Sequence, residues 1–339
     1  MSSRAAPDVS VLLPVRNGER TLERALASLD RQLFRRFEVV AVDDGSSDAT
    51  AAILARWART DPRVRPVGQP PLGIVAALET ARRHARGRWL ARMDADDEAH
   101  PMRLFRQYEL AVSDGEVGLV GCHVRYAPRA GLSDGARRYE AWLNALVTPQ
   151  EIARDVWVEC PVAHPTFFLR ADVLEDVGGY RDMGWPEDYD LLLRLHLAGV
   201  RCRNVPARLL RWWDDPGRLS RNAPAYSPAA FRRCKVHHLR RSLLAGRAGA
   251  VIWGAGPTGK AFSRALLDAG IAVLAFVEVD PRKIGQDIHG APVVPVEEAI
   301  TFAEALHLGA VGRAGGRASV RATAARVGLL EGGNFVAIA

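Results

Sequence analysis

Short apolar runs alternate with longer, helically periodic segments along the first hundred residues. The runs are rich in β-branched and other apolar residues and predict strands, which we place at 9–15, 38–42, 64–67 and 88–93. The intervening segments carry apolar residues three and four positions apart and predict helices, which we place at 19–33, 49–59 and 73–84. Because the connections are short, the pattern predicts an α/β fold with parallel strands, right-handed crossovers and helices on both faces.

The pattern is mixed between residues 100 and 245. Helices are expected at 103–112 and at 139–156, the latter with a break near Pro149, and extended segments at 117–126 and 167–170. An apolar helix opens at residue 187, a polar, turn-rich loop is expected at 211–221, and a basic helix at 230–244.

The alternation then resumes after a glycine-containing linker at 246–249. Strands are expected at 250–253, 273–277, 292–294, 306–311 and 334–338, with helices from residue 260 and from residues 315–316. This predicts two domains, one at 1–240 and a small Rossmann-like one at 246–339.

Composition and charge exclude several classes. The 339 residues are 48% apolar, which suits packed cores, and no apolar run reaches the length of a membrane span. The start has no signal-peptide hydrophobic region, so we expect a cytoplasmic protein, with peripheral contact at the inner face of the membrane left open. The four cysteines have no zinc spacing and are expected to be reduced thiols.

The formal net charge of +7 does not by itself indicate a nucleic-acid partner. Of 46 basic residues only three are lysines (Lys235, Lys260 and Lys283), and the arginines are dispersed along the chain. A nucleic-acid-binding protein would be expected to show a continuous basic stripe and a known binding module, and neither is seen. A biased genome composition explains the arginine content, so no nucleic-acid partner is predicted.

Acidic clusters follow two of the predicted strands. Asp43 and Asp44 end the second strand, and Asp94, Asp96 and Asp97 follow the fourth. Each cluster alone is compatible with a helix-capping turn. Both clusters at the carboxyl edge of one parallel sheet fit better with a site where a divalent cation bridges carboxylates and a diphosphate.

Two later segments offer further polar groups. Glu187, Asp188 and Asp190 open an apolar helix, where acids suit the helix dipole, and one of them is also placed to act as a general base. The predicted loop at 211–221 is either an exposed loop or a lid that holds phosphate through Arg218 and Arg221.

A glycine-rich motif opens the second domain. Gly254, Gly256 and Gly259 form G-x-G-x-x-G between a predicted strand and helix, and acids follow about 20 residues later, including Asp280. This context is typical of nucleotide binding, whether to a nucleotide, a nucleotide sugar or NAD, although the domain could also serve only in assembly.

The first 220 residues resemble an inverting family 2 glycosyltransferase with the GT-A fold. The motifs that carry the resemblance are Leu13–Gly18, Val42–Asp48, Arg92–Asp97, His164–Thr166, Gly178–Tyr180 and Glu187–Asp190. Glu79 departs from the pattern, since bacterial members often have Asn there. The last 90 residues more loosely resemble the nucleotide-sugar-binding amino-terminal domains of sugar O-acyltransferases, and no acyltransferase repeat follows them.

The resemblance implies roles for the donor-binding residues. Pro14, Arg16 and Asn17 would border the nucleotide, and Asp44, with Asp43, would bind its base. Asp94 would face the ribose or the metal, and Asp96 would hold Mn²⁺ or Mg²⁺ on the diphosphate.

The resemblance also implies a reaction. Asp188 would take the proton of an acceptor hydroxyl that attacks the sugar of a nucleotide-diphosphate donor, by default a UDP-sugar, with inversion. The acceptor would be a glycan or a lipid-linked saccharide. Two alternatives stay open: an accessory or regulatory protein that binds nucleotide sugars, and a nucleotidyltransferase on a related fold.

Overall fold

The chain forms two compact units in the computed structural model, which describes residues 6–215, 217–313 and 315–339. The first unit comprises the residues up to Ala153 together with Pro161–Met183 and Ala198–Arg221. The second comprises Arg154–Cys160, Gly184–Leu197 and the residues from Asn222 onward. The two units are thus interleaved along the chain. The predicted domains 1–240 and 246–339 describe a division along the sequence and stay a prediction.

A mixed eight-stranded sheet lies at the centre of the first unit, with the strand order β3-β2-β1-β4-β7-β6-β8-β5. Its strands are β1 (Val9–Val15), β2 (Phe37–Asp44), β3 (Val64–Gln69), β4 (Trp89–Arg92), β5 (Glu98–Ala99), β6 (Val117–Ala127), β7 (Phe168–Arg170) and β8 (Arg201–Trp213). β1 is buried throughout, as expected for a strand covered on both faces. It pairs in parallel with β2 and β4, so the carboxyl ends of these three strands meet at one edge.

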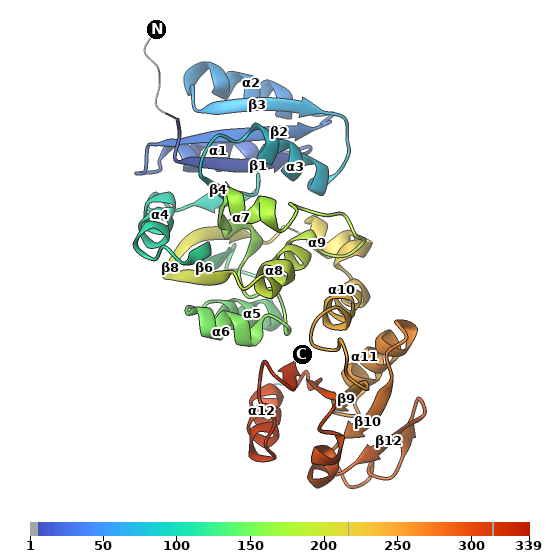
Figure 1. Ribbon diagram of the computed structural model, residues 1–339. Helices are drawn as coiled ribbons and strands as arrows, with labels where there is room; N and C mark the ends of the chain where they lie inside the picture. Colours follow the sequence, from blue (N-terminus) through green and yellow to red (C-terminus); the bar gives the residue numbers. More distant parts are fainter. Residues whose placement is uncertain (1–5, 216, 314) are drawn as a thin grey trace. The chain divides into compact units, whose positions relative to one another are not determined.

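Along the chain, helices lie between the strands of this sheet and after the last of them (Figure 1). They are α1 (Leu22–Asp30), α2 (Thr50–Thr60), α3 (Ile74–His84), α4 (Arg103–Ser113), α5 (Asp134–Leu143), α6 (Pro149–Asp155), α7 (Ala171–Asp176) and α9 (Leu219–Asn222). α1 buries Leu22, Leu26 and Leu29, the apolar face that the periodicity predicts. α3 packs against β1 and β2.

The second unit has a six-stranded sheet with the order β11-β12-β10-β9-β13-β14. Its strands are β9 (Ala250–Trp253), β10 (Val273–Val277), β11 (Asp287–Ile288), β12 (Ala291–Val294), β13 (Leu306–Gly309) and β14 (Phe335–Ala337). β10 and β13 pair in parallel with opposite sides of β9. The strand order therefore reverses at β9, the point at which open α/β sheets bind ligands beyond the strands' carboxyl ends.

Helices complete the second unit. They are α8 (Glu187–Leu197), α10 (Pro228–Arg240), α11 (Pro257–Asp268) and α12 (Gly316–Arg326), with short 3₁₀ turns η2 (Pro224–Tyr226) and η3 (Val296–Phe302). α10 packs against both α8 and α11. No helix of the described residues is both long enough and apolar enough to cross a lipid bilayer.

The α/β class is confirmed, and so is the parallel pairing expected for the first four strands, β1 to β4. The later strands make the sheet mixed, because β7 runs antiparallel to β4 and β6, and β5 antiparallel to β8. One expectation about the first sheet is wrong. The loop expected at 211–221 begins with the last residues of β8, a 13-residue strand paired with β6. Pro206, which has no N–H to donate, lies between the paired residues Val205 and Arg208, where the register shifts.

Candidate active site

Two loops meet at the carboxyl ends of β1 and β2. Asn17, exposed and with a positive φ of 51°, follows β1. Its backbone N–H donates to the Ser46 hydroxyl at 2.9 Å, and its side-chain oxygen accepts from the Ser47 N–H at 2.9 Å. These bonds join the loops, so the predicted donor residues Pro14, Arg16 and Asn17 lie beside the loop after Asp43 and Asp44.

The two acids that end β2 hold backbone N–H groups. Asp44 is buried, and its carboxylate accepts from the Gln69 amide and from the N–H groups of Leu72 and Gly73 at 2.7–2.9 Å. It thereby fixes the loop that enters α3. Asp43, half-buried, accepts from the Ser46 N–H at 3.0 Å. Each acid thus has a structural task, and the role of either in binding a base stays a prediction.

Three carboxylates gather where the chain leaves β4. One side-chain oxygen from each of Asp94, Asp96 and Asp97 lies within 4.8 Å of the other two. Arg92 pairs with Asp94 at 2.6 Å, and Asp97 accepts from the Trp213 N–H at 2.8 Å. The other oxygen of Asp97 is buried and has no hydrogen-bond donor among the described residues. A divalent cation is the kind of ligand that would satisfy such a cluster.

Charge within this cluster is unevenly distributed. Burial and the neighbouring Asp94 raise the pKa of Asp96 to about 6. Burial and the two other carboxylates raise the pKa of Asp97 well above its usual range. Burial also acts on Asp94, but the cations of Arg92 and Arg218 outweigh it and bring the pKa of Asp94 below its ordinary value. The cluster therefore favours an added positive charge.

Aromatic and cationic side chains from β8 and the following segment border the acids. Arg218, one of the two predicted phosphate-binding arginines, lies over the Trp212 ring at 4.8 Å, and its charge acts on all three acids. Arg24 lies over the Trp213 ring at 3.9 Å and donates to the Asp96 carbonyl at 2.6 Å. Arg221 instead pairs with Asp214 at 2.5 Å. The structure thus brings Arg218 into the electrostatic environment of the cluster, whereas the contact shown for Arg221 is with Asp214.

Two further motifs meet through Tyr180. The Nε2 atom of buried His164 lies 3.1 Å from the Tyr180 hydroxyl, and the Tyr180 N–H donates to the Glu79 carboxylate at 2.7 Å. Glu79 also pairs with Arg82 at 2.9 Å. Gly179 has φ +66°, and an added Cβ would lie 2.5 Å from Glu79. In this chain Glu79 therefore anchors the Gly178–Tyr180 turn to α3.

The predicted general base lies in the second unit, at the start of α8. Asp188 is half-buried, and its carboxylate accepts from the Tyr189 N–H at 2.7 Å. Its acidic neighbours are buried, with Glu187 bound by the Tyr226 hydroxyl at 2.5 Å and Asp190 held by three donors. Of the three acids in this turn, Asp188 is the one left partly accessible to solvent.

A cavity of about 480 Å³ lies at the carboxyl ends of β9, β10 and β13. Two of the predicted glycines, Gly254 and Gly256, line it. A Cβ on Gly259 would lie 2.0 Å from the Gly254 carbonyl oxygen, so this glycine lets α11 approach the loop closely. The volume is within the range of small-molecule sites.

The acids beside this cavity have different partners. Glu278 accepts from the Ala255 N–H at 3.1 Å and from Lys283 at 2.9 Å, so it supports the glycine loop directly. Asp280 also lines the cavity but pairs with Arg282 at 2.9 Å. Glu278 directly follows β10 in the sequence. This position after a strand indicates that Glu278 belongs to the site together with Asp280.

A family model described as glycosyl transferase family 2 matches residues 10–178. The amylovoran biosynthesis glycosyltransferase AmsE of Erwinia amylovora is 30% identical over 205 residues, which cover 60% of this chain and 74% of AmsE. The chain belongs to glycosyl transferase family 2 and is a glycosyltransferase. This favours glycosyl transfer over both the nucleotidyltransferase and the accessory-protein alternatives.

Solved structures support the fold of the glycosyltransferase part. S. aureus TarS, solved in complex with UDP-GlcNAc, aligns with a TM-score of 0.55 and 18% identity over 68% of this chain and 66% of the TarS chain. The mannosyltransferase PcManGT of Pyrobaculum calidifontis, in complex with GDP-Man and Mn²⁺, aligns with a TM-score of 0.52 and 22% identity over 78% of this chain and 76% of that one. The first sheet and its helices therefore have a GT-A-like fold.

Proposed function

We propose that this protein is a metal-dependent, inverting glycosyltransferase that uses a nucleotide-diphosphate sugar, with a UDP-sugar expected first. The observation that carries the proposal is the carboxylate cluster after β4, next to the strand ends of β1 and β2. The buried Asp97 oxygen without a donor among the described residues and the raised pKa of Asp96 both fit carboxylates that share a divalent cation. The complexes of TarS with UDP-GlcNAc and of PcManGT with GDP-Man and Mn²⁺ support this class of donor.

Asp96 and Asp94 would hold the divalent ion, Mn²⁺ or Mg²⁺, with Asp97 close by. Carboxylate oxygens are the ligands that these hard cations prefer, and the three acids offer them within 4.8 Å. The ion, when bound, supplies positive charge to offset the charge that develops on the departing diphosphate. Arg218 would add to that charge from its position over Trp212. For Arg221 a phosphate contact would require it to leave Asp214.

The loops after β1 and β2 would bind the nucleoside. Arg16 and Asn17 are exposed there, directly after β1, and buried Pro14 is the penultimate residue of that strand. Asp43 and Asp44 would contact the base, Asp44 while it also holds the loop into α3.

Asp188 would act as the general base. As the acceptor hydroxyl attacks C1 of the sugar, its proton passes to the Asp188 carboxylate, a new C1–O bond forms, and the bond from C1 to the diphosphate oxygen breaks with its electron pair leaving on the nucleoside diphosphate. Attack opposite the leaving group inverts the anomeric centre in one step. A half-buried carboxylate between two buried, fully engaged acids suits this role.

The acceptor we propose is a glycan or a lipid-linked saccharide hydroxyl. AmsE is named for the biosynthesis of amylovoran, and a polysaccharide-building role would suit this chain as well. We place the protein in the cytoplasm, where peripheral contact with the inner face of the membrane would bring it to a lipid-linked acceptor.

The second unit would bind a nucleotide or nucleotide sugar through Gly254, Gly256, Gly259 and Asp280. Its cavity lies where the strand order of the second sheet reverses, beside the parallel strands β10, β9 and β13, and Lys283 and Arg313 are among its lining residues. Helices α11 and α12 both begin at this cavity, and helix N-termini favour anionic groups.

A donor panel tests the proposed reaction. The purified full chain is incubated with UDP-, GDP- and dTDP-sugars with Mn²⁺ or with EDTA, and release of nucleoside diphosphate is measured. We expect release from one class of donor, dependent on the metal and accelerated by an acceptor saccharide. Release at the same rate in EDTA would contradict metal dependence, and a product that retains the donor's anomeric configuration would contradict inversion.

A further inference from the structure

In the first turn of α8, the side chains of Glu187, Tyr189 and Asp190, which flank Asp188 in the sequence, all make hydrogen bonds. The Glu187 carboxylate accepts from the Tyr226 hydroxyl at 2.5 Å, and the Tyr189 hydroxyl donates to the Val156 carbonyl at 2.8 Å. Asp190 is buried and binds donors from its own helix and from α10. The helix turn that carries Asp188 is therefore fixed through the side chains next to it in sequence.

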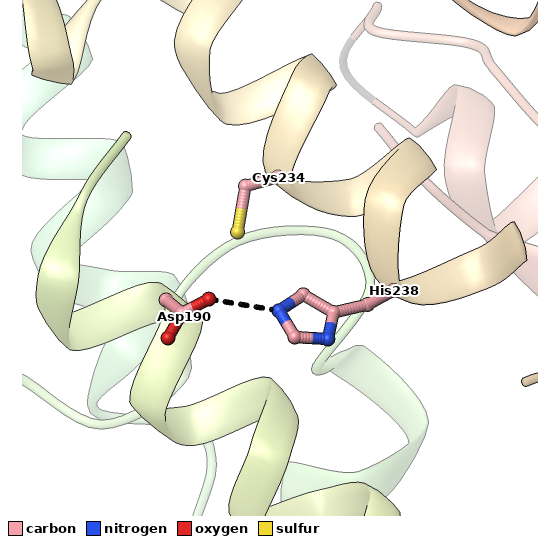
Figure 2. Close-up of side chains that lie close together, drawn as sticks. All are labelled: Asp190, Cys234 and His238. Atoms are coloured by element: carbon pink, nitrogen blue, oxygen red, sulfur yellow. Dashed lines mark hydrogen bonds and ion pairs between the residues drawn. The ribbon is translucent and has the colours of Figure 1, made fainter. Parts of the chain in front are cut away.

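Asp190 is the centre of these contacts. One of its carboxylate oxygens accepts from Trp185 Nε1 and from His238 Nε2, both at 3.0 Å, and the other accepts from Arg194 Nε at 2.8 Å. Figure 2 shows the His238 ring on α10 pointing at Asp190 on α8, with Cys234 beside them. Burial raises the pKa of Asp190, but the hydrogen bond from His238 and the charge of Arg194 outweigh it and bring the pKa to about 2.

This cluster is better explained as a hydrogen-bonded support than as a metal or nucleophile site. Asp190, Cys234 and His238 are close enough to share an ion, but the Arg194 cation already lies on the Asp190 carboxylate and opposes a second cation. Burial raises the pKa of the Cys234 thiol far above its usual range, so it stays protonated and is a poor nucleophile.

We propose that His238 is a positioning residue for glycosyl transfer, which through its hydrogen bond to Asp190 fixes the first turn of α8 and with it the Asp188 carboxylate. The proposal rests on the proposed role of Asp188 as the base. The Asp190 oxygen can only accept, so Nε2 of His238 carries the hydrogen in this contact. A base must stay within hydrogen-bond reach of the acceptor hydroxyl, and a displacement of about 1 Å can cost roughly 10²-fold in rate.

Substitutions at residue 238 separate positioning from packing. His238→Leu removes the donor, whereas His238→Gln keeps an N–H group near the position of Nε2. Val236→Ala, which removes two buried methyl groups from the same helix and no hydrogen bond, is the matched control. We expect His238→Leu to lower kcat by about tenfold or more with an unchanged KM for the donor. His238→Gln should restore most of the activity, and Val236→Ala should keep it.

A second measurement distinguishes positioning from a general loss of folded enzyme. In an Asp188→Asn background, His238→Leu should cause no further loss of kcat, because there is no longer a base to orient. Equal losses in the wild-type and Asp188→Asn backgrounds would overturn the proposal, as would wild-type kcat in His238→Leu. Wild-type turnover in Asp188→Asn itself would instead refute the proposed base.

A substitution of Asp190, which accepts the hydrogen bond from His238, covers the case in which His238→Leu does not fold. Asp190→Asn keeps the size of the side chain but removes the charge that His238, Trp185 and Arg194 bind. We then expect Asp190→Asn to lower kcat while His238→Gln does not. Wild-type kcat in Asp190→Asn would overturn the proposal.

Discussion

At the scale of single residues, buried charges define both parts of the proposed chemistry. Burial and the neighbouring Asp94 oppose the ionisation of Asp96 and Asp97. A bound cation would offset the repulsion between these carboxylates and so favour their charged forms. Asp188 is half-buried, between Glu187 and Asp190, whose carboxylates are already engaged. Carboxylates of the same kind are thus assigned to different tasks by their surroundings.

Asp96→Ala tests the metal part of this assignment. Removal of this carboxylate takes away one of the proposed ligands, so we expect Mn²⁺-dependent binding of the donor to fall below detection, and transfer with it. Calorimetry with a UDP-sugar, in the presence and absence of Mn²⁺, measures this. Glu98→Ala, which removes a nearby acid that pairs with Arg211, is the control and should bind like the wild type. Unchanged Mn²⁺-dependent binding in Asp96→Ala would exclude Asp96 as a ligand.

Asp188→Asn tests the base. The amide cannot take a proton, so we expect kcat to fall by about 10²–10⁴ while donor binding is nearly preserved. Steady-state kinetics and donor calorimetry on the same preparation give both values. Asp182→Asn, a change of the same kind at an exposed acid of the chain, should leave kcat unchanged. Full turnover in Asp188→Asn would mean that another group accepts the proton.

Lys235 gives the stability of the protein a characteristic pH dependence. Its ammonium is buried and donates to the carbonyls of Val158 and Ile338 at 2.6 and 2.9 Å. Burial lowers the pKa of Lys235 from 10.5 to about 8, despite the opposing effect of Glu159. Between these two values the unfolded chain binds the proton and the folded chain does not. Stability should therefore rise with pH in this window, by up to about 1.4 kcal/mol per pH unit from this group.

Lys235→Met isolates that contribution. Denaturant unfolding of wild type and variant between pH 7.5 and pH 10.5 should show that the difference in unfolding free energy grows with pH in favour of the wild type. Lys260→Met, a change of the same kind at an exposed position of α11, should follow the wild-type pH profile. A constant difference between the wild type and Lys235→Met across this range would contradict a lowered pKa at Lys235.

At the scale of elements, the apolar runs were sufficient to predict those strands that are themselves continuous apolar segments of the sequence. The limits predicted for β1, β9 and β10 agree with the structure, because each strand is a compact apolar run between turn residues. β8 was not predicted, because it contains several arginines and Pro206 and depends on pairing with the distant β6. Strand pairing between distant segments has no local signal in the sequence.

The same distinction applies to the site. The acids at the ends of β2 and β4 could be predicted from the sequence, because parallel strands bring their carboxyl ends to one edge. The contacts of Asp97 with Trp213 and of Asp190 with His238 could not, because they join segments 116 and 48 residues apart. Such contacts depend on packing, for which residue spacing gives no rule.

The turn from β9 into α11 gives a prediction at this scale. Gly256 has an extended backbone (φ −87°), and an added Cβ would meet nothing within 4 Å, whereas a Cβ on Gly259 would lie 2.0 Å from the Gly254 oxygen. We expect Gly256→Leu to fill part of the cavity and abolish nucleotide binding by the second unit without loss of stability. Gly259→Ala should lower the free energy of unfolding by roughly 1–3 kcal/mol.

Calorimetry in EDTA with UDP, a UDP-sugar and NAD measures the first effect, and thermal unfolding measures the second. EDTA removes the metal that the proposed donor site requires, so binding that remains is assigned to the cavity of the second unit. Equal nucleotide binding by Gly256→Leu and the wild type would place the nucleotide elsewhere.

At the scale of the whole molecule, the second unit includes elements that lie within the predicted glycosyltransferase domain, residues 1–240. The segment Arg154–Cys160 and α8 belong to it, together with α10 and the second sheet. Within this unit Asp155 is buried and pairs with Arg321 on α12 at 2.8 Å and with Arg317 at 3.7 Å. Lys235 likewise binds Ile338 near the end of the chain. The residues after 246 therefore contribute to the packing around the proposed base.

Truncation after Gly246 should for this reason impair transfer even if the second domain never binds a ligand. The truncated chain loses both α12 partners of buried Asp155, which keeps Arg154 at 3.2 Å, and it loses the Ile338 carbonyl bound by Lys235, so the packing of residues 154–160 should weaken. We expect faster hydrogen exchange in residues 154–160 and in α8, and a lower kcat. Arg321→Ala in the full-length chain should show part of the same effect, whereas Arg326→Ala, at an exposed position of the same helix, should not.

Wild-type kcat and wild-type hydrogen exchange in the truncated chain would mean that the base does not need the second domain. If Gly256→Leu keeps full activity while truncation does not, the second domain supports transfer through its packing and not through its ligand.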